Sequence, residues 1–113
     1  MARILVVDDD EAIRNLYSNA LKSAGYQVET ATDGDQALLF LEHDSFDLMV
    51  TDLKMKRLDG DELARQAKEK WPAMPILMTT GSLAPDDCKA DYILPKPCAL
   101  FDFLDQVKRL LKK

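Results

Sequence analysis

The sequence contains no long apolar run. A helix that crosses a bilayer needs about 20 consecutive apolar residues, and stretches such as RILVV and PILMTT are much shorter. The opening MARILVV carries one arginine and then meets three acids, which is unlike a secretory signal peptide. Both absences favour a cytoplasmic protein without a membrane span.

Cysteine and histidine are also scarce. The chain has two cysteines, Cys88 and Cys98, and one histidine, His43. Their spacing matches no zinc motif, and two cysteines cannot form the disulfide framework of a small secreted protein. We expect two free thiols in a reducing compartment, with a regulatory disulfide between them as the alternative.

Basic residues are outnumbered by acidic ones. Lys and Arg total 15 against 20 Asp and Glu, which gives a formal charge of −5. Such a surface argues against direct binding to nucleic acid or to an anionic membrane. The length of 113 residues suits one domain over residues 1–113, because a chain of this size can bury a sufficient core without disulfides.

Short apolar runs alternate with longer segments of helical period. The runs predict five strands: RILVV (3–7), QVETA (27–31), DLMVT (47–51), PILMTT (75–80) and YIL (92–94). Apolar residues at helical spacing predict a helix after each of the first three strands and after the last. Gly25 and Pro72 provide stops for the first and third of these helices.

This alternation predicts βαβ units, a parallel sheet and a three-layer α/β domain. The first, third and fourth strands are the most apolar, as expected in the middle of a sheet covered on both faces. The second and fifth strands then form the edges of a doubly wound sheet with strand order 2-1-3-4-5. No glycine-rich fingerprint follows the first strand, so a dinucleotide site is not indicated.

Charged residues lie at the ends of three strands of this predicted sheet. Asp8 and Asp9 end the first strand, Asp52 ends the third, and Lys96 follows the fifth. Parallel strands bring these ends to one edge, where three acids need a compensating cation, so the pattern predicts a divalent metal. The alternative for Asp8 and Asp9 is to cap the following helix, a role that Asp10 fills equally well.

Three dipeptides add to this set: Asp59-Gly60, Thr79-Thr80 and Lys96-Pro97. Together with the strand-end acids, the ordered set resembles the receiver domains of two-component response regulators, of the chemotaxis-regulator type. The resemblance extends over essentially the whole chain. It implies a flavodoxin-like fold and a non-enzymatic signalling role, with at most self-phosphorylation from small donors and self-dephosphorylation.

The resemblance also assigns roles around the acids. It makes Asp52 the phosphoacceptor, and a carboxylate is a competent nucleophile for phosphoryl transfer. Asp8 and Asp9 look like the residues that hold Mg²⁺ together with Asp52, with Asp9 the more direct ligand and Asp8 acting partly through water. The backbone carbonyl of Lys54 completes the protein's share of ligands. Magnesium suits this set because it prefers oxygen ligands and accepts one or two carboxylates.

Two further residues receive roles from the same resemblance. Lys96 offers a positive charge to Asp52 and then to the phosphoryl oxygens. Thr80 supplies a hydroxyl that follows the phosphoryl group, and Thr79 is the alternative if the register differs by one residue. The peptide bond between Lys96 and Pro97 is expected to be cis.

The resemblance implies partners as well: a histidine kinase or phosphotransfer protein as donor, and a downstream protein as target. We expect a stand-alone receiver that is a monomer or weak dimer. One alternative is the receiver portion of a longer transcriptional regulator, and another is a docking module that no longer uses phosphate. A metal-dependent phosphohydrolase is disfavoured because the chain lacks a clear general acid and places His43 far from the acids.

The sequence departs from the receiver pattern in three places. Lys54 lies two residues after Asp52, and Lys56 lies four residues after it. Receiver domains usually have proline at the position that Lys56 occupies. The aromatic switch position holds Ile93, and Tyr92 comes one residue earlier, so strand alternation turns the ring to the other face or onto a helix. Eleven residues, GSLAPDDCKAD, separate Thr80 from Tyr92, so the helix between the fourth and fifth strands is predicted to be shortened or absent.

Overall fold

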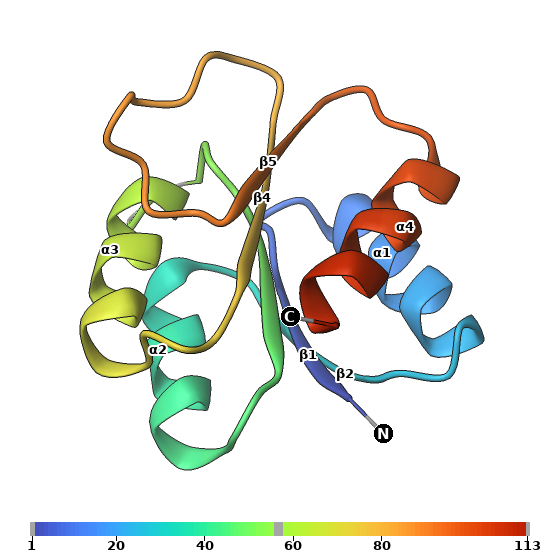
Figure 1. Cartoon of the computed structure of the whole chain (residues 1–113), viewed down its shortest axis with the longest axis horizontal. Helices are drawn as coiled ribbons and strands as arrows, with labels where there is room; N and C mark the ends of the chain where they lie inside the picture. The colour runs from blue at the N-terminus through green and yellow to red at the C-terminus, as the bar shows by residue number, and fades with distance from the viewer. Residues whose placement is uncertain (1, 56–57, 113) are drawn as a thin grey trace.

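The computed structural model describes residues 2–55 and 58–112. Five parallel strands form one sheet in the order β2-β1-β3-β4-β5, as predicted (Figure 1). The elements in chain order are β1 (Arg3–Val7), α1 (Glu11–Ser23), β2 (Gln27–Ala31), α2 (Gly34–His43), β3 (Leu48–Asp52), α3 (Gly60–Lys70), β4 (Ile76–Thr80), β5 (Tyr92–Pro95) and α4 (Leu100–Leu111). The predicted strands and helices are therefore confirmed, with β3 ending on Asp52 itself.

Aspartates begin three of the helices. The side chain of Asp10 accepts hydrogen bonds from the backbone N–H groups of Ala12 and Ile13, Asp33 caps α2, and Asp59 caps α3. Capping satisfies N–H groups that have no partner inside the helix. Because Asp10 caps α1, the carboxylates of Asp8 and Asp9 are not needed for that purpose.

The sheet divides the core into two layers. On one side α2 and α3 cover it, and on the other side α1 and α4 do (Figure 1). Alternating residues of β1, β3 and β4 supply each layer: Leu5, Met49 and Met78 face α2 and α3, whereas Ile4, Val50 and Leu77 face α1 and α4. Strands buried on both faces explain the continuous apolar runs in the sequence.

The connection from β4 to β5 contains no helix. Residues 81–91 are all described and form bends and one turn, in which the backbone N–H of Cys88 donates to the carbonyl oxygen of Pro85. The prediction of a shortened or absent crossover helix is confirmed, and the structure shows that the helix is absent. Strand β5 is poorly covered on both faces. Tyr92 and Ile93 are 40% and 36% exposed, so Tyr92 is not buried against a helix.

The two thiols are free and half-buried. Cys88 packs against the layer of α2 and α3, with its Sγ 3.7 Å from the Sδ of Met78. Cys98 packs against the layer of α1 and α4, with its Sγ 3.8 Å from the hydroxyl oxygen of Tyr17. The two thiols thus pack against different layers of the core, and they are not joined by a disulfide in this structure.

No helix in the described ranges is both long and apolar enough to cross a membrane.

Candidate functional site

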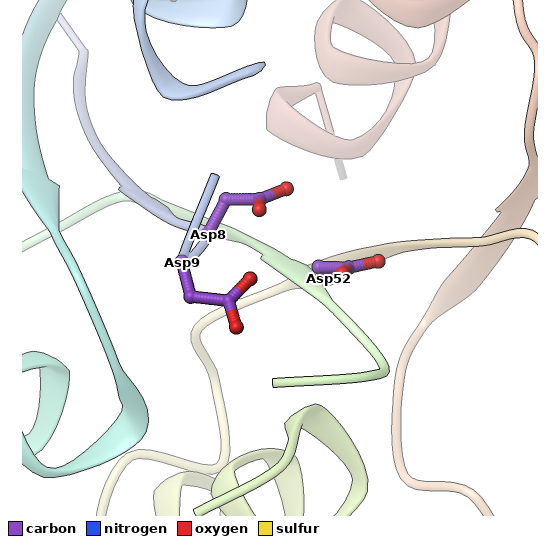
Figure 2. Close-up of side chains that lie close together, drawn as sticks. All are labelled: Asp8, Asp9 and Asp52. Carbon is purple, nitrogen blue, oxygen red and sulfur yellow. The ribbon is translucent and has the colours of Figure 1, made fainter. Parts of the chain in front are cut away.

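Three carboxylates gather at the carboxyl edge of the sheet. Asp8 and Asp9 follow β1, and Asp52 ends the adjacent strand β3 (Figure 2). One carboxylate oxygen from each residue lies within 4.8 Å of the other two. The predicted convergence of these acids is therefore found in the structure. It follows from the parallel pairing of β1 with β3, which places both strand ends at the same edge.

Asp8 is the most buried of the three, with only 2% of its surface exposed. Its Oδ1 accepts a hydrogen bond of 2.9 Å from the backbone N–H of Asp10, and its carbonyl oxygen accepts one from Arg14. Its Oδ2 is buried with no hydrogen bond, and the nearest cation, Nζ of Lys96, is 3.8 Å away. Burial raises the pKa of Asp8 above its ordinary value, and the nearby charge of Asp52 adds to this effect.

This raised pKa predicts that Asp8 destabilises the fold at neutral pH. Between the ordinary pKa of 3.8 and the raised value, the folded chain holds a proton that the unfolded chain has lost, so this contribution falls as the pH rises. We expect Asp8→Asn, measured in a chelator at neutral pH, to be more stable than wild type by about 1 kcal/mol. The advantage should shrink as the pH falls through that window.

Urea unfolding of both chains at several pH values measures this difference. Asp86→Asn, a change at an exposed acid of the β4–β5 connection, is the matched control and should show no such trend. A stability difference between wild type and Asp8→Asn that stays constant with pH would contradict the prediction.

Lys96 provides the positive charge of the site. Its Nζ lies 3.1 Å from Oδ1 of Asp52, and the two side chains are 27% and 11% exposed. The backbone N–H of Lys96 donates to the carbonyl oxygen of Thr80, which holds the end of β5 against β4. The peptide bond from Lys96 to Pro97 is cis, as predicted. An acid trio with one lysine at this edge can hold an oxygen-liganded cation and receive an anionic group.

Comparison with known proteins places this arrangement in a family. The sequence-family model described as the response regulator receiver domain matches residues 4–108 of this chain. The chain belongs to the response regulator receiver domain family. Curated relatives include Response regulator MprA of Mycobacterium leprae, 41% identical, and of Mycolicibacterium vanbaalenii, 42% identical; each alignment covers 98% of this chain and 51% of the relative. The chain therefore spans about half the length of these relatives.

Solved receiver structures have the same fold. A CheY-like receiver domain protein from Methanospirillum hungatei superposes with a TM-score of 0.94 at 32% identity, over 99% of this chain and 94% of that one. The response regulator TrrA of Thermotoga maritima, solved in complex with Mg(2+)-BeF, superposes with a TM-score of 0.92 at 32% identity, over 97% of this chain and 99% of that one.

The two threonines of this receiver domain differ in their surroundings. Thr80 is 3% exposed, and its hydroxyl donates to the carbonyl oxygen of Ser82, 3.0 Å away, and accepts from the backbone N–H of Ser82. Its hydroxyl is thus bonded to Ser82 within its own loop. Thr79 pairs directly with Asp52 across β3 and β4 and is completely buried. The register thus places Thr79 beside Asp52, the last residue of β3, and Thr80 at the end of β4.

The sequence places two lysines, Lys54 and Lys56, shortly after Asp52. Lys54 is exposed, and Lys56 lies outside the described residues. Ile93, at the position usually taken by an aromatic ring in receivers, pairs with Met78, which faces α2 and α3. Tyr92 shares the opposite face with Leu94, as strand alternation predicts. On the face toward α2 and α3, strand β5 therefore carries Ile93 where receivers usually have an aromatic ring.

The donor set of the receiver site fits a magnesium ion. Its three clustered side chains all offer carboxylate oxygens, and Mg²⁺ prefers oxygen ligands. The buried Oδ2 of Asp8 has no hydrogen-bond partner, which costs stability unless a cation or a water bound to it approaches. Both observations concern this chain and are independent of the comparisons.

Two contacts that shape the site were not predicted from the sequence, although Gly60 belongs to the ordered set that resembles receiver domains. Arg14 on α1 holds the backbone of Asp8 through a 2.8 Å hydrogen bond to its carbonyl oxygen. Gly60 begins α3 directly beneath Asp52: a Cβ at this glycine would lie 2.1 Å from the carbonyl oxygen of Asp52. An Asp-Gly pair suggests only a turn, and an arginine on a predicted helix suggests only a solvated face, so neither contact had a clear signal.

Proposed function

We propose that this receiver domain accepts a phosphoryl group on Asp52 from a histidine kinase or a phosphotransfer protein. The observation that carries the proposal is the pairing of a buried strand-end carboxylate with Lys96, at 3.1 Å, beside the carboxylates of Asp8 and Asp9. The lysine can compensate the charge of the acceptor before transfer and the charge of the phosphoryl group afterwards.

The proposed reaction is a simple displacement at phosphorus. An oxygen of Asp52 forms a bond to phosphorus while the bond from phosphorus to the donor's imidazole nitrogen breaks, and the electron pair stays on that nitrogen, which takes up a proton. Most of the catalysis of such transfers comes from positioning and from charge compensation. In this chain β3 positions Asp52 and the junction after β5 positions Lys96.

We further propose Mg²⁺ as the cofactor. Asp8, Asp9, Asp52 and the backbone carbonyl of Lys54 would hold it, and the solved structure of TrrA is described as a complex with Mg(2+)-BeF. When bound, the ion neutralises the negative charge shared by the acceptor and the incoming phosphoryl group. The chain's own part is to bury Asp8 and to hold its carboxylate in place through the backbone N–H of Asp10.

The proposed output is a change in the affinity of a protein partner, with no catalysis on an external substrate. Thr80 can leave Ser82 and turn its hydroxyl to the phosphoryl group, which would draw the β4–β5 connection inward. Because that connection has no helix and Ile93 replaces the usual ring, the surface that changes here is the exposed loop and strand β5. The usual receiver dimer through the crossover helix is not expected, so we propose a monomer or weak dimer.

The same proposal holds for a stand-alone receiver and for the receiver portion of a longer regulator, and the greater length of the curated relatives supports the second. The site's retained acids and lysine favour phosphorylation over a docking module that no longer uses phosphate. His43 ends α2 and is absent from the acid cluster, which gives no support to a phosphohydrolase.

Intact mass measurement tests the proposed function. After incubation with a small acyl-phosphate donor, we expect the chain to gain one phosphoryl group with Mg²⁺ present and none when a chelator removes the metal. Mg²⁺ without donor is the control for adduct formation. A chain that gains no phosphoryl group under either condition would support the phosphate-independent docking module instead.

A further inference from the structure

The segment that carries Lys96 joins β5 to α4 over residues 96–99. At its start the backbone N–H of Lys96 donates to the carbonyl oxygen of Thr80 at 2.7 Å. At its other end Ala99 precedes α4, and no side chain caps this helix, whereas aspartates cap α1, α2 and α3. A contact between these two ends therefore has a strong influence on the position of Lys96.

Cys98 makes such a contact. Its Sγ lies 3.8 Å from the hydroxyl oxygen of Tyr17 on α1, in a hydrogen bond for which either group can be the donor. Tyr17 is itself well fixed, because it is buried and its ring stacks on the ring of Phe103 with the centroids 4.3 Å apart. Phe103 is completely buried near the start of α4. Tyr17 thus joins α1, the segment after Lys96 and the beginning of α4.

The hydroxyl of Tyr17 lies on the same side of the sheet as the acid cluster. The valines two positions before Asp8 and Asp52 face α1 and α4, and strand alternation turns the two acids to that side as well. Burial raises the pKa of Tyr17, the hydrogen bond with Cys98 adds to the rise, and so do the charges of Asp8 and Asp52. The hydroxyl therefore stays protonated at neutral pH, and it is close enough to the acids to be affected by their charge.

A buried phenol hydroxyl in this layer needs an explanation. Phenylalanine would give the same stacking without the cost of burying a polar group. The buried hydroxyl of Thr79 makes no hydrogen bond, whereas the hydroxyl of Tyr17 has the Sγ of Cys98 as its partner. Hydrogen bonds that involve sulfur are weak, so this one adds little to stability. Its larger effect is to fix the segment that begins with Lys96.

The proposed reaction requires a well-placed Lys96. Its Nζ lies 3.1 Å from Oδ1 of Asp52 and 3.8 Å from Oδ2 of Asp8. During transfer the ammonium group must stay beside the acceptor and within reach of the entering phosphoryl oxygens. The lysine side chain is long and flexible, so its placement depends on how firmly its backbone is held. Small displacements of a group that takes part in transfer have large effects on rate.

We propose that Tyr17 is a positioning residue for phosphoryl transfer, which holds Cys98 and thereby keeps the backbone of Lys96 in place beside Asp52. The inference rests on the proposed function and deepens it. Lys96 interacts most strongly with the charge that develops during transfer. Loss of the contact should therefore lower the maximal rate and leave the donor concentration at half-maximal rate unchanged.

Tyr17→Phe, Cys98→Ala and the double variant test this inference. Tyr17→Phe keeps the ring that stacks on Phe103 and removes only the hydroxyl, and Cys98→Ala removes its partner. Intact mass gives the rate of phosphoryl gain over a range of acyl-phosphate concentrations with Mg²⁺. We expect each single variant to lose about fivefold in maximal rate. Because both substitutions break one contact, the double variant should lose about fivefold as well, and not the product of the two losses.

Tyr26→Phe is the matched control. Tyr26 packs partly buried against the same layer of the core, and its hydroxyl is removed by the same substitution. We expect its rate of phosphoryl gain to equal that of wild type. The midpoint of thermal unfolding, measured without phosphate, should change no more in Tyr17→Phe than in Tyr26→Phe.

Each other outcome overturns the inference in an identifiable way. A maximal rate of Tyr17→Phe within about twofold of wild type would show that the contact has no part in transfer. Losses that multiply in the double variant would show that the two side chains act independently. Equal losses in Tyr17→Phe and Tyr26→Phe would show a general effect of packing. If the wild type gains no phosphoryl group, the proposed function fails and this inference fails with it, whereas a phosphorylated wild type with an unaffected Tyr17→Phe rejects the inference alone.

Discussion

Replacing Asp52 by asparagine is expected to abolish the gain of a phosphoryl group. The amide removes the nucleophilic oxygen pair and the negative charge that Lys96 compensates at 3.1 Å, while it keeps nearly the same shape. The loss should be complete within the detection limit of intact mass measurement with donor and Mg²⁺. The fold should persist, because the substitution also relieves the repulsion between Asp52 and the buried Asp8.

Asp59→Asn is the matched control for this variant. Asp59 lies in the same β3–α3 connection, but its side chain caps α3 by accepting from the backbone N–H of Glu62 at 3.1 Å. Asparagine caps helices about as well as aspartate, so stability and phosphorylation should both be retained. Persistent labelling of Asp52→Asn, or loss of labelling in Asp59→Asn, would contradict the assignment of the acceptor.

Replacing Gly60 by alanine is expected to damage the fold and the site together. The added Cβ would lie 2.1 Å from the carbonyl oxygen of Asp52 and 2.9 Å from the Cα of Leu53, and both are backbone atoms that cannot swing away. The backbone N–H of Gly60 also donates to the carbonyl oxygen of Leu53 at 2.8 Å, which ties the start of α3 to the end of β3. We expect a loss of about 2 to 4 kcal/mol in the free energy of unfolding.

The folded fraction of Gly60→Ala should also be phosphorylated more slowly. Relief of the clash must move α3 or the backbone of Asp52, and small displacements of a reacting group have large effects on rate. Urea unfolding and the rate of phosphoryl gain measure the two effects. Gly81→Ala is the control, because nothing lies within 4 Å of its Cβ position. Equal behaviour of the two alanine variants would show that the close approach at Gly60 is not a real constraint.

Much of the site could be predicted from the sequence, because its residues lie at the ends of strands. Asp8, Asp52 and Lys96 each come at the end of a run that could be recognised as a parallel strand, and parallel strands bring such ends together. The absent helix between β4 and β5 followed from the number of residues available. In both cases chain length and strand direction suffice, without knowledge of any side-chain conformation.

The remaining features depend on side-chain direction and on close packing. The sequence suggested that Thr80 serves the site, but the bond of its hydroxyl to Ser82 is a matter of rotamer choice. Thr79 lies in an apolar strand where a β-branched residue is expected anyway, so nothing in the pattern indicated an unsatisfied hydroxyl. The contact of Gly60 with Asp52 depends on the distance between α3 and β3, and sequence spacing does not determine that distance.

The separation of Cys88 and Cys98 by the sheet gives the domain two natural attachment points for chemical probes. A reagent on Cys88 would report on the β4–β5 connection and the layer of α2 and α3, and one on Cys98 would report on the junction after Lys96 and the layer of α1 and α4. Since each thiol can be removed singly by mutation to serine, motion on the two sides of the sheet can be followed separately in one chain.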